Sequence, residues 1–174
     1  MGEHFDRIAS ASLRPASADD EPFLFELYAG TRAEELDAWG WNEAQREAFL
    51  RMQFRAQQQS YRMSYPGAEH GVIVLEGNPV GRVIVNRTEG ELLIVDIALL
   101  PECRGSGIGT ALIKDLLAEA AETDRRVRLH VLLTNAKARR LYERLGFSEV
   151  SDNGVFALME WRRLGREERA ERLS

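Results

Sequence analysis

The chain has 174 residues, of which 44% are apolar and 29% charged, and its formal net charge is −5 at pH 7. This composition is typical of a soluble globular domain and excludes a fibrous or wholly disordered chain. The excess of acids disfavours sequence-independent nucleic-acid binding, and no apolar run approaches the ~18 residues that a membrane span needs. Because the first ten residues carry no export pattern and Cys103 is the single cysteine, we expect a cytoplasmic protein without a disulfide or a thiolate zinc site.

The first third of the chain predicts one strand followed by helices. Residues 10–16 predict the strand, and an acidic turn at Asp19 or Asp20 begins a helix that Gly30 is expected to end. Residues 31–62 predict further helix, interrupted at a Trp-Gly-Trp segment and carrying a solvated run of three glutamines. The apolar face of the first helix and the buried positions of the second stretch are expected at these residues: Phe23, Leu24, Leu27 and Tyr28, then Leu50, Phe54 and Met52.

From about residue 70 the apolar residues take the spacing of strands. Residues 72–75 and 80–85 predict a hairpin around a Gly-Asn-Pro turn. Residues 92–100 form the longest apolar run of the chain, and Asp96 alone interrupts it. This run predicts a central strand that is buried on both faces.

The last part of the chain alternates helices and strands. Helical spacing covers residues 110–123, strand alternation covers 127–131, and Asn135 begins a helix that Gly146 ends. Two final strands are expected at residues 147–150 and 155–161. The resulting order, β-α-α-β-β-β-α-β-α-β-β, predicts an α/β fold (an α+β mixed sheet) with helices packed on its faces.

The most informative segment, residues 99–110, is a strand that runs into a glycine-rich loop and then into a helix start. Glycines at every second position leave the backbone uncovered, so successive N–H groups can converge on an anion such as a pyrophosphate. Arg104 can add a positive charge at the rim. Thr110 stands where the dinucleotide-binding fingerprint needs a glycine, and the loop lacks the lysine of a P-loop. A flexible turn that binds nothing is the alternative.

Two blocks together resemble the GNAT superfamily of acyl-CoA-dependent N-acyltransferases. Arg104-x-x-Gly107-x-Gly109 resembles the family's Arg/Gln-x-x-Gly-x-Gly/Ala motif, and residues 135–147 resemble its Asn-x-x-Ala-x-x-Leu-Tyr-x-x-x-Gly-Phe segment. The resemblance extends over residues 70–161. It implies a GNAT-like fold with a central mixed sheet of six to seven strands and helices on both faces. We expect a single domain over residues 1–162, followed by a charged tail at 163–174.

The resemblance also implies acetyl-CoA as the acyl donor, without a metal, held where two parallel strands splay apart. The backbone at the end of the first of these strands would pair with the pantetheine amides, and the loop N–H groups would hold the pyrophosphate. Asn135 would bond the donor or simply cap its helix, and both roles are compatible. The residues implied in donor binding are Leu99, Leu100, Arg104, Gly105, Ser106, Gly107, Ile108, Gly109, Thr110, Asn135 and Ala138.

Two residues are candidates for acid–base chemistry. A phenol with the ordinary pKa of ~10 stays protonated at neutral pH, so Tyr142 can protonate a departing thiolate; the alternative is a tyrosine packed on its helix face. Asp96 is a candidate base for the amine, or a buried carboxylate that is hydrogen-bonded to a neighbouring element. Glu69 and His70 are further candidates for the base, and a water chain is another route.

In the family the acceptor contacts the first two helices and the last hairpin. Acidic and aromatic residues there suit a cationic or aromatic amine, although core packing and solvation explain them more simply: Glu34, Glu35, Trp39, Trp41, Tyr61, Tyr65 and Phe156. We therefore expect direct acetyl transfer in a ternary complex to a primary amine of a small molecule or peptide. Neither nucleic acid nor membrane is an expected partner, and a homodimer is compatible. The alternatives are a non-catalytic acyl-CoA-binding or regulatory module and, more distantly, a dinucleotide-binding oxidoreductase.

Overall fold

The computed structural model describes residues 11–37 and 40–163, without the side chains of residues 33–35 and 37. The described residues form a mixed seven-stranded sheet and four α-helices, which confirms the predicted fold class and element order. The elements are β1 (Ala11–Pro15), η1 (Ala18–Asp20), α2 (Glu21–Asp37), α3 (Glu43–Ser64), β2 (Glu69–Leu75), β3 (Asn78–Arg87), β4 (Glu91–Leu99), η2 (Pro101–Cys103), α4 (Ile108–Glu122), β5 (Arg126–Leu132), α5 (Ala136–Arg144), β6 (Ser148–Asp152) and β7 (Phe156–Trp161).

The strands follow the order β1-β2-β3-β4-β5-β7-β6 across the sheet. β1 with β2, β2 with β3, β5 with β7 and β6 with β7 pair antiparallel, whereas β4 pairs with β5 in parallel. Branched and long apolar side chains fill the interior and are almost wholly removed from solvent, among them Val72, Ile84, Leu92, Val127 and Met159. Their burial supplies the main stabilising contribution to the fold.

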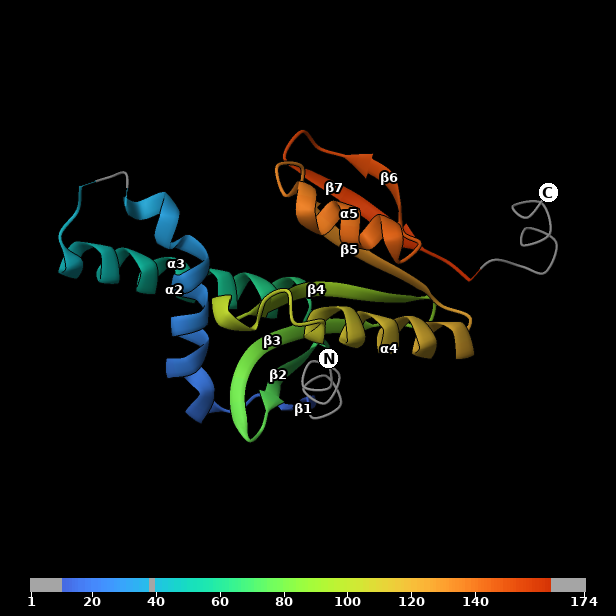
Figure 1. Ribbon diagram of the computed structural model, residues 1–174, viewed down its shortest axis with the longest axis horizontal. Coiled ribbons are helices and arrows are strands. Elements are labelled where there is room, and N and C mark those ends of the chain that lie inside the picture. The colour runs from blue at the N-terminus through green and yellow to red at the C-terminus, as the bar shows by residue number, and fades with distance from the viewer. Residues whose placement is uncertain (1–10, 38–39, 164–174) are drawn as a thin grey trace. The chain divides into compact units, whose positions relative to one another are not determined.

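The described residues form two compact units, and β3 and β4 run through both. Of the described residues, the first unit holds those up to Val85 together with 96–109, and the second holds 86–95 and 110–163. Figure 1 shows α2 and α3 in blue and teal. In the first unit the buried Phe54 ring of α3 packs against rings of α2, whereas Met52, which was expected to be buried, is 60% exposed because it lies on another face of α3. The Phe54 ring makes two such contacts. Its centroid lies 5.7 Å from those of Phe25 and Tyr28.

Helix α2 does not end at Gly30, and that prediction was wrong. The helix continues to Asp37 and carries Gly30 in its interior, where an added Cβ would meet no atom within 4 Å. An interior glycine costs a helix only ~1 kcal/mol relative to alanine. Burial of Leu27, Tyr28 and Leu36 on the same helix offsets that cost, so packing overrides the local signal.

Several predicted features fall outside the described structure. Trp39 and residues 164–174 of the predicted tail lie outside the described residues, as do the side chains of Glu34 and Glu35. The division into one domain and a tail therefore stays a prediction. None of the helices that the structure describes is long and apolar enough to cross a membrane.

The entry into α2 is fixed by a buried carboxylate, that of Asp20. It accepts hydrogen bonds from the Ser17 backbone N–H at 2.8 Å and from two Arg14 guanidinium nitrogens at 2.8 and 2.6 Å. The Arg14 hydrogen bonds and then the Ser17 N–H hold the pKa of Asp20 well below its usual range. This ion pair joins the end of β1 to the start of the helices.

We expect Asp20→Asn to lower the melting temperature, and the deficit to depend on pH. The pKa of Asp20 is lower in the folded chain than the ~3.9 of an unfolded one, so the carboxylate stabilises the fold above that value and loses this effect as the pH falls below it. Thermal melts should show the largest difference from the unmodified protein at pH 5–7 and a shrinking one toward pH ~2. The matched control is the exposed neighbour, Asp19→Asn. A pH-independent deficit would contradict the assignment.

Candidate active site

The connection from β4 to α4 is held by the chain's own hydrogen bonds. The Leu100 N–H donates to the Val80 carbonyl at 2.9 Å, and the Leu100 carbonyl accepts from the Cys103 N–H at 2.9 Å. The second bond closes the single turn η2, which Pro101 begins. Both backbone groups of Leu100 are therefore already engaged, so the pairing expected between Leu100 and pantetheine would use the second lone pair of its carbonyl or displace its N–H bond to Val80.

Side chains of the loop tie its two ends together. Arg104 is exposed, and its Nε donates to the Leu99 carbonyl at 3.0 Å. The Ser106 hydroxyl donates to the Cys103 carbonyl at 2.6 Å. The terminal nitrogens of Arg104 have no partner among the described residues, so they can serve as donors to an anion beside the end of β4.

Two of the three loop glycines are required by the backbone conformation. Gly105 has φ +72° and Gly107 has φ +88°, in the left-handed region that other residues rarely adopt. A Cβ added at Gly105 would meet nothing within 4 Å, whereas one added at Gly109 would make an ordinary contact with Leu99 at 3.6 Å. Left-handed turns of this kind expose successive N–H groups in an anion-binding concavity. The local geometry thus suits a phosphate at Gly105 and Gly107, and sterics alone do not explain Gly109.

The second predicted block forms α5 and its two ends. The Asn135 side-chain oxygen accepts from the Ala138 N–H at 3.1 Å, so Asn135 caps the helix, as one of its two interpretations proposed. Tyr142 is 8% exposed, and its ring centroid lies 5.7 Å from that of Phe147. Gly146 ends the helix at φ +94°. The contact of Asn135 with the donor and the chemistry of Tyr142 stay predictions.

Asp96 is not a lone carboxylate, because the structure pairs it with Arg82 of β3. The Arg82 side chain is only 6% exposed; its Nη2 donates to Asp96 Oδ2 and, at 3.2 Å, to Gln57 Oε1. Gln57 belongs to the glutamine run that was expected to be solvated, so that expectation was wrong for this residue. Arg82 Nε and Nη1 are buried without a hydrogen-bond partner among the described residues.

The residues around this pair have shifted pKa values. Burial raises the pKa of Tyr61 to about 12, and the charge of Asp96 acts in the same direction. Burial also lowers the pKa of His70 below its usual range, and Arg82 and Arg62 add to the effect. At neutral pH Tyr61 is therefore a protonated phenol and His70 an uncharged imidazole. Glu69, the other candidate base, is exposed at the start of β2.

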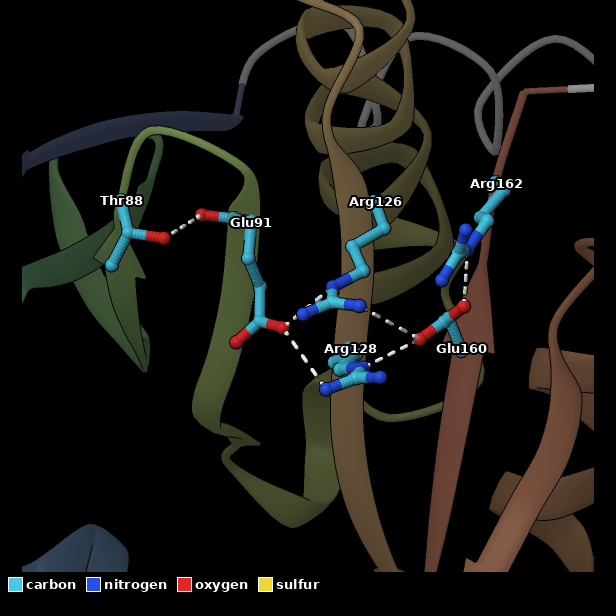
Figure 2. Close-up of polar contacts among 6 residues, drawn as sticks. All are labelled: Thr88, Glu91, Arg126, Arg128, Glu160 and Arg162. Carbon is cyan, nitrogen blue, oxygen red and sulfur yellow. Dashed lines mark hydrogen bonds and ion pairs between the residues drawn. The ribbon is translucent and has the colours of Figure 1, made fainter.

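An ionic network in the second unit joins β4, β5 and β7, as Figure 2 shows. Glu91 accepts from Arg126 Nε at 3.0 Å and lies 3.3 Å from Arg128 Nη1, and Glu160 pairs with both arginines and with Arg162. These side chains are partly exposed, so each pair contributes little to stability. Together they explain why arginines alternate with apolar residues along β5.

The parallel pairing of β4 with β5 occupies only the first part of each strand. Its register runs from Glu91↔Arg126 to Ile94↔Leu129, whereas β4 continues to Leu99 and β5 to Leu132. Within the second unit, Val95 and His130 no longer continue this register.

A family model described as the Acetyltransferase (GNAT) family matches residues 26–147. An uncharacterized N-acetyltransferase of Methanocaldococcus jannaschii is 36% identical over 88 residues, which cover 49% of this chain and 55% of that protein. A Bacillus subtilis protein named as a candidate ribosomal protein bS18-alanine N-acetyltransferase is 31% identical over 104 residues, 55% of this chain and 69% of that one.

The solved structure of the PaiA N-acetyltransferase from Thermoplasma acidophilum, in complex with coenzyme A, superposes with a TM-score of 0.67. It is 18% identical and covers 88% of this chain and 99% of its own, which shows the fold. Residues 26–147, which the family model matches, include both motif blocks and strands β2 to β5. The chain therefore belongs to the acetyltransferase (GNAT) family.

Arg82 is the residue of this region that sequence reasoning missed. It lies within the apolar strand run at residues 80–85, and Asp96 lies within another. Two opposite charges that each interrupt a buried strand suggest a pair, because an unpaired buried charge is very costly. That signal was available for both residues. No group of three or more His, Cys, Asp or Glu side chains among the described residues could hold a metal ion.

We expect Asp96→Ala to lower the free energy of unfolding by about 3 kcal/mol, because it leaves the Arg82 guanidinium buried without its countercharge. The double variant Arg82→Met/Asp96→Ala should recover part of this loss. Urea denaturation measures both. Glu47→Ala is the control, since Glu47 and Arg51 form an exposed pair and its loss should cost less than ~1 kcal/mol. Equal losses in the single and double variants would contradict the role of the pair.

Proposed function

We propose that the protein is an N-acetyltransferase that moves the acetyl group of acetyl-CoA to a primary amine of a small molecule or peptide. The observation that carries this proposal is the left-handed backbone at Gly105 and Gly107, between a strand and a helix, in the position of the family's motif. Membership of the family and the N-acetyltransferase names of both relatives support it. We further propose a cytoplasmic enzyme that needs neither nucleic acid, membrane nor metal.

We propose that the donor is held mainly by backbone groups. The N–H groups from Gly105 through Ser106, Gly107, Ile108 and Gly109 to Thr110 would bind the diphosphate, with Arg104 beside them. Leu99 and Leu100 would pair with the pantetheine arm; the carbonyl of each already accepts one hydrogen bond, from Arg104 and Cys103 respectively, and keeps a second lone pair. Asn135 and Ala138, at the start of α5, would contact the donor along its length.

We propose direct transfer within a ternary complex. The neutral amine attacks the thioester carbonyl, so an N–C bond forms as the C–S bond breaks. The Tyr142 phenol gives its proton to the leaving thiolate and regains one that the new amide nitrogen releases. Asp96 is the proposed base for the initial ammonium. Because Arg82 competes for the same carboxylate, a water chain is the second route for that proton.

We expect Gly107→Val to abolish measurable acetyl-CoA binding, because the side chain strains a left-handed position and covers the amides. The loss of affinity should exceed ~100-fold, about 2.7 kcal/mol, in a calorimetric titration. Gly154→Val is the matched control: Gly154 also has a positive φ, +82°, in the β6–β7 turn, and a Cβ added there would meet nothing within 4 Å. Unchanged affinity in Gly107→Val, or an equal loss in both variants, would contradict the proposed loop function.

We expect Tyr142→Phe to lower kcat by about 10²–10⁴-fold, with the Kd of acetyl-CoA changed less than ~2-fold. The phenyl ring preserves the contact with Phe147 and removes only the proton donor. A CoA-release assay over a panel of primary amines measures the rate and identifies the acceptor. Full activity of the variant would remove the general acid but leave the enzyme assignment intact. Donor binding without CoA release for any amine would favour the non-catalytic module.

A further inference from the structure

One face of α3 is polar although it lines a groove of the first unit. Its residues stand at positions i, i+3, i+4 and i+7, so they share one helix face: Arg55, Gln58, Gln59 and Arg62. The groove has a volume of about 910 Å³. The other walls come from the start of α2, with Glu21 and Leu24, and from the segment that leads into β2, with Tyr65 and His70.

The hydrogen-bonding groups of this face are mostly donors. Arg55 and Arg62 have neither a hydrogen bond nor an ion pair with any described residue, and both are exposed. The Gln58 amide nitrogen has no hydrogen-bond partner among the described residues, but it is buried and therefore not open to a ligand in the groove. The donors that the face presents are the two guanidinium groups. Glu21 is the one acidic residue of the lining, and it belongs to α2.

The spacing and the remaining lining define the shape of a ligand. Arg55 and Arg62 lie two helical turns apart, about 10 Å along the axis, so two long side chains can reach one anionic group between them. Leu24, Phe54 and Met63 add apolar surface. Pockets for small organic molecules have similar volumes and combine apolar walls with a few polar groups.

We propose that this groove binds a small organic anion whose carboxylate or phosphate is held by Arg55 and Arg62, and whose apolar part lies against Leu24 and Phe54. None of the residues 99–110 or 135–147 lines the groove. The site is therefore additional to the proposed donor site and does not depend on it.

The test is a calorimetric titration with four probes that share a phenyl group: 4-phenylbutyrate, phenyl phosphate, 4-phenylbutylamine and 4-phenylbutanol. Both anions should bind at least ~10-fold more tightly than the amine and the alcohol, about 1.4 kcal/mol. A preference between the two anions identifies the head group. Equal affinity for the carboxylate and the alcohol, or no binding of either anion, would overturn the proposal.

Variants locate the binding and separate it from the donor site. Arg55→Gln and Arg62→Gln should each weaken 4-phenylbutyrate binding at least ~10-fold, whereas Arg144→Gln, an equal change of charge at an exposed position of α5, should not. Gly107→Val should keep 4-phenylbutyrate binding while it loses acetyl-CoA. Unchanged affinity in both groove variants would contradict the proposed groove site. Loss of 4-phenylbutyrate binding in Gly107→Val would also contradict it, because the anion would then bind at the donor loop.

Discussion

Gly105 and Gly107 allow the chain to leave β4, turn sharply and begin α4. Both have positive φ, a conformation that costs a residue with a Cβ roughly 1–2 kcal/mol. Hydrogen bonds hold this connection, since Leu100 bonds to Val80 and Cys103, and the Ser106 hydroxyl bonds to the Cys103 carbonyl. In the proposed donor site, a connection held in this way would meet the diphosphate with less loss of entropy from ordering the loop.

The two units use charge in different ways. In the first, the guanidinium of Arg82 is buried beside Asp96 and Gln57, where losing either charge leaves the other without compensation. In the second, Glu91 and Glu160 bridge partly exposed arginines of β5, where solvent weakens each pair. The buried pair thus constrains how α3 meets β3 and β4, whereas the partly exposed network lies where the parallel ladder of β4 and β5 begins.

Most of the fold could be predicted from local periodicity, because the spacing of apolar residues in strands and helices is a property of short segments. The element order and the glycine turn followed from it. The prediction that the helix ends at Gly30 was wrong because tertiary packing retains a helix that one glycine only weakens. The prediction that Gln57 is solvated was wrong because its hydrogen-bond partner, Arg82, lies on a strand that is distant in the sequence. The hydrogen bonds of the Leu100 backbone could not be predicted either, because the side chains of a sequence do not indicate which carbonyl a given peptide N–H will bind. The identity of the acceptor could not be predicted, because side chains from several elements would select it and their spacing in the sequence does not show which of them lie together.

A crystal structure of the protein with CoA would locate the donor. We expect diphosphate oxygens about 2.7–3.2 Å from backbone nitrogens between Gly105 and Thr110, with the sulfur beside the Tyr142 phenol. A diphosphate bound away from those amides would rule out the glycine loop as the donor site, and a phenol turned away from the sulfur would rule out Tyr142 as the acid.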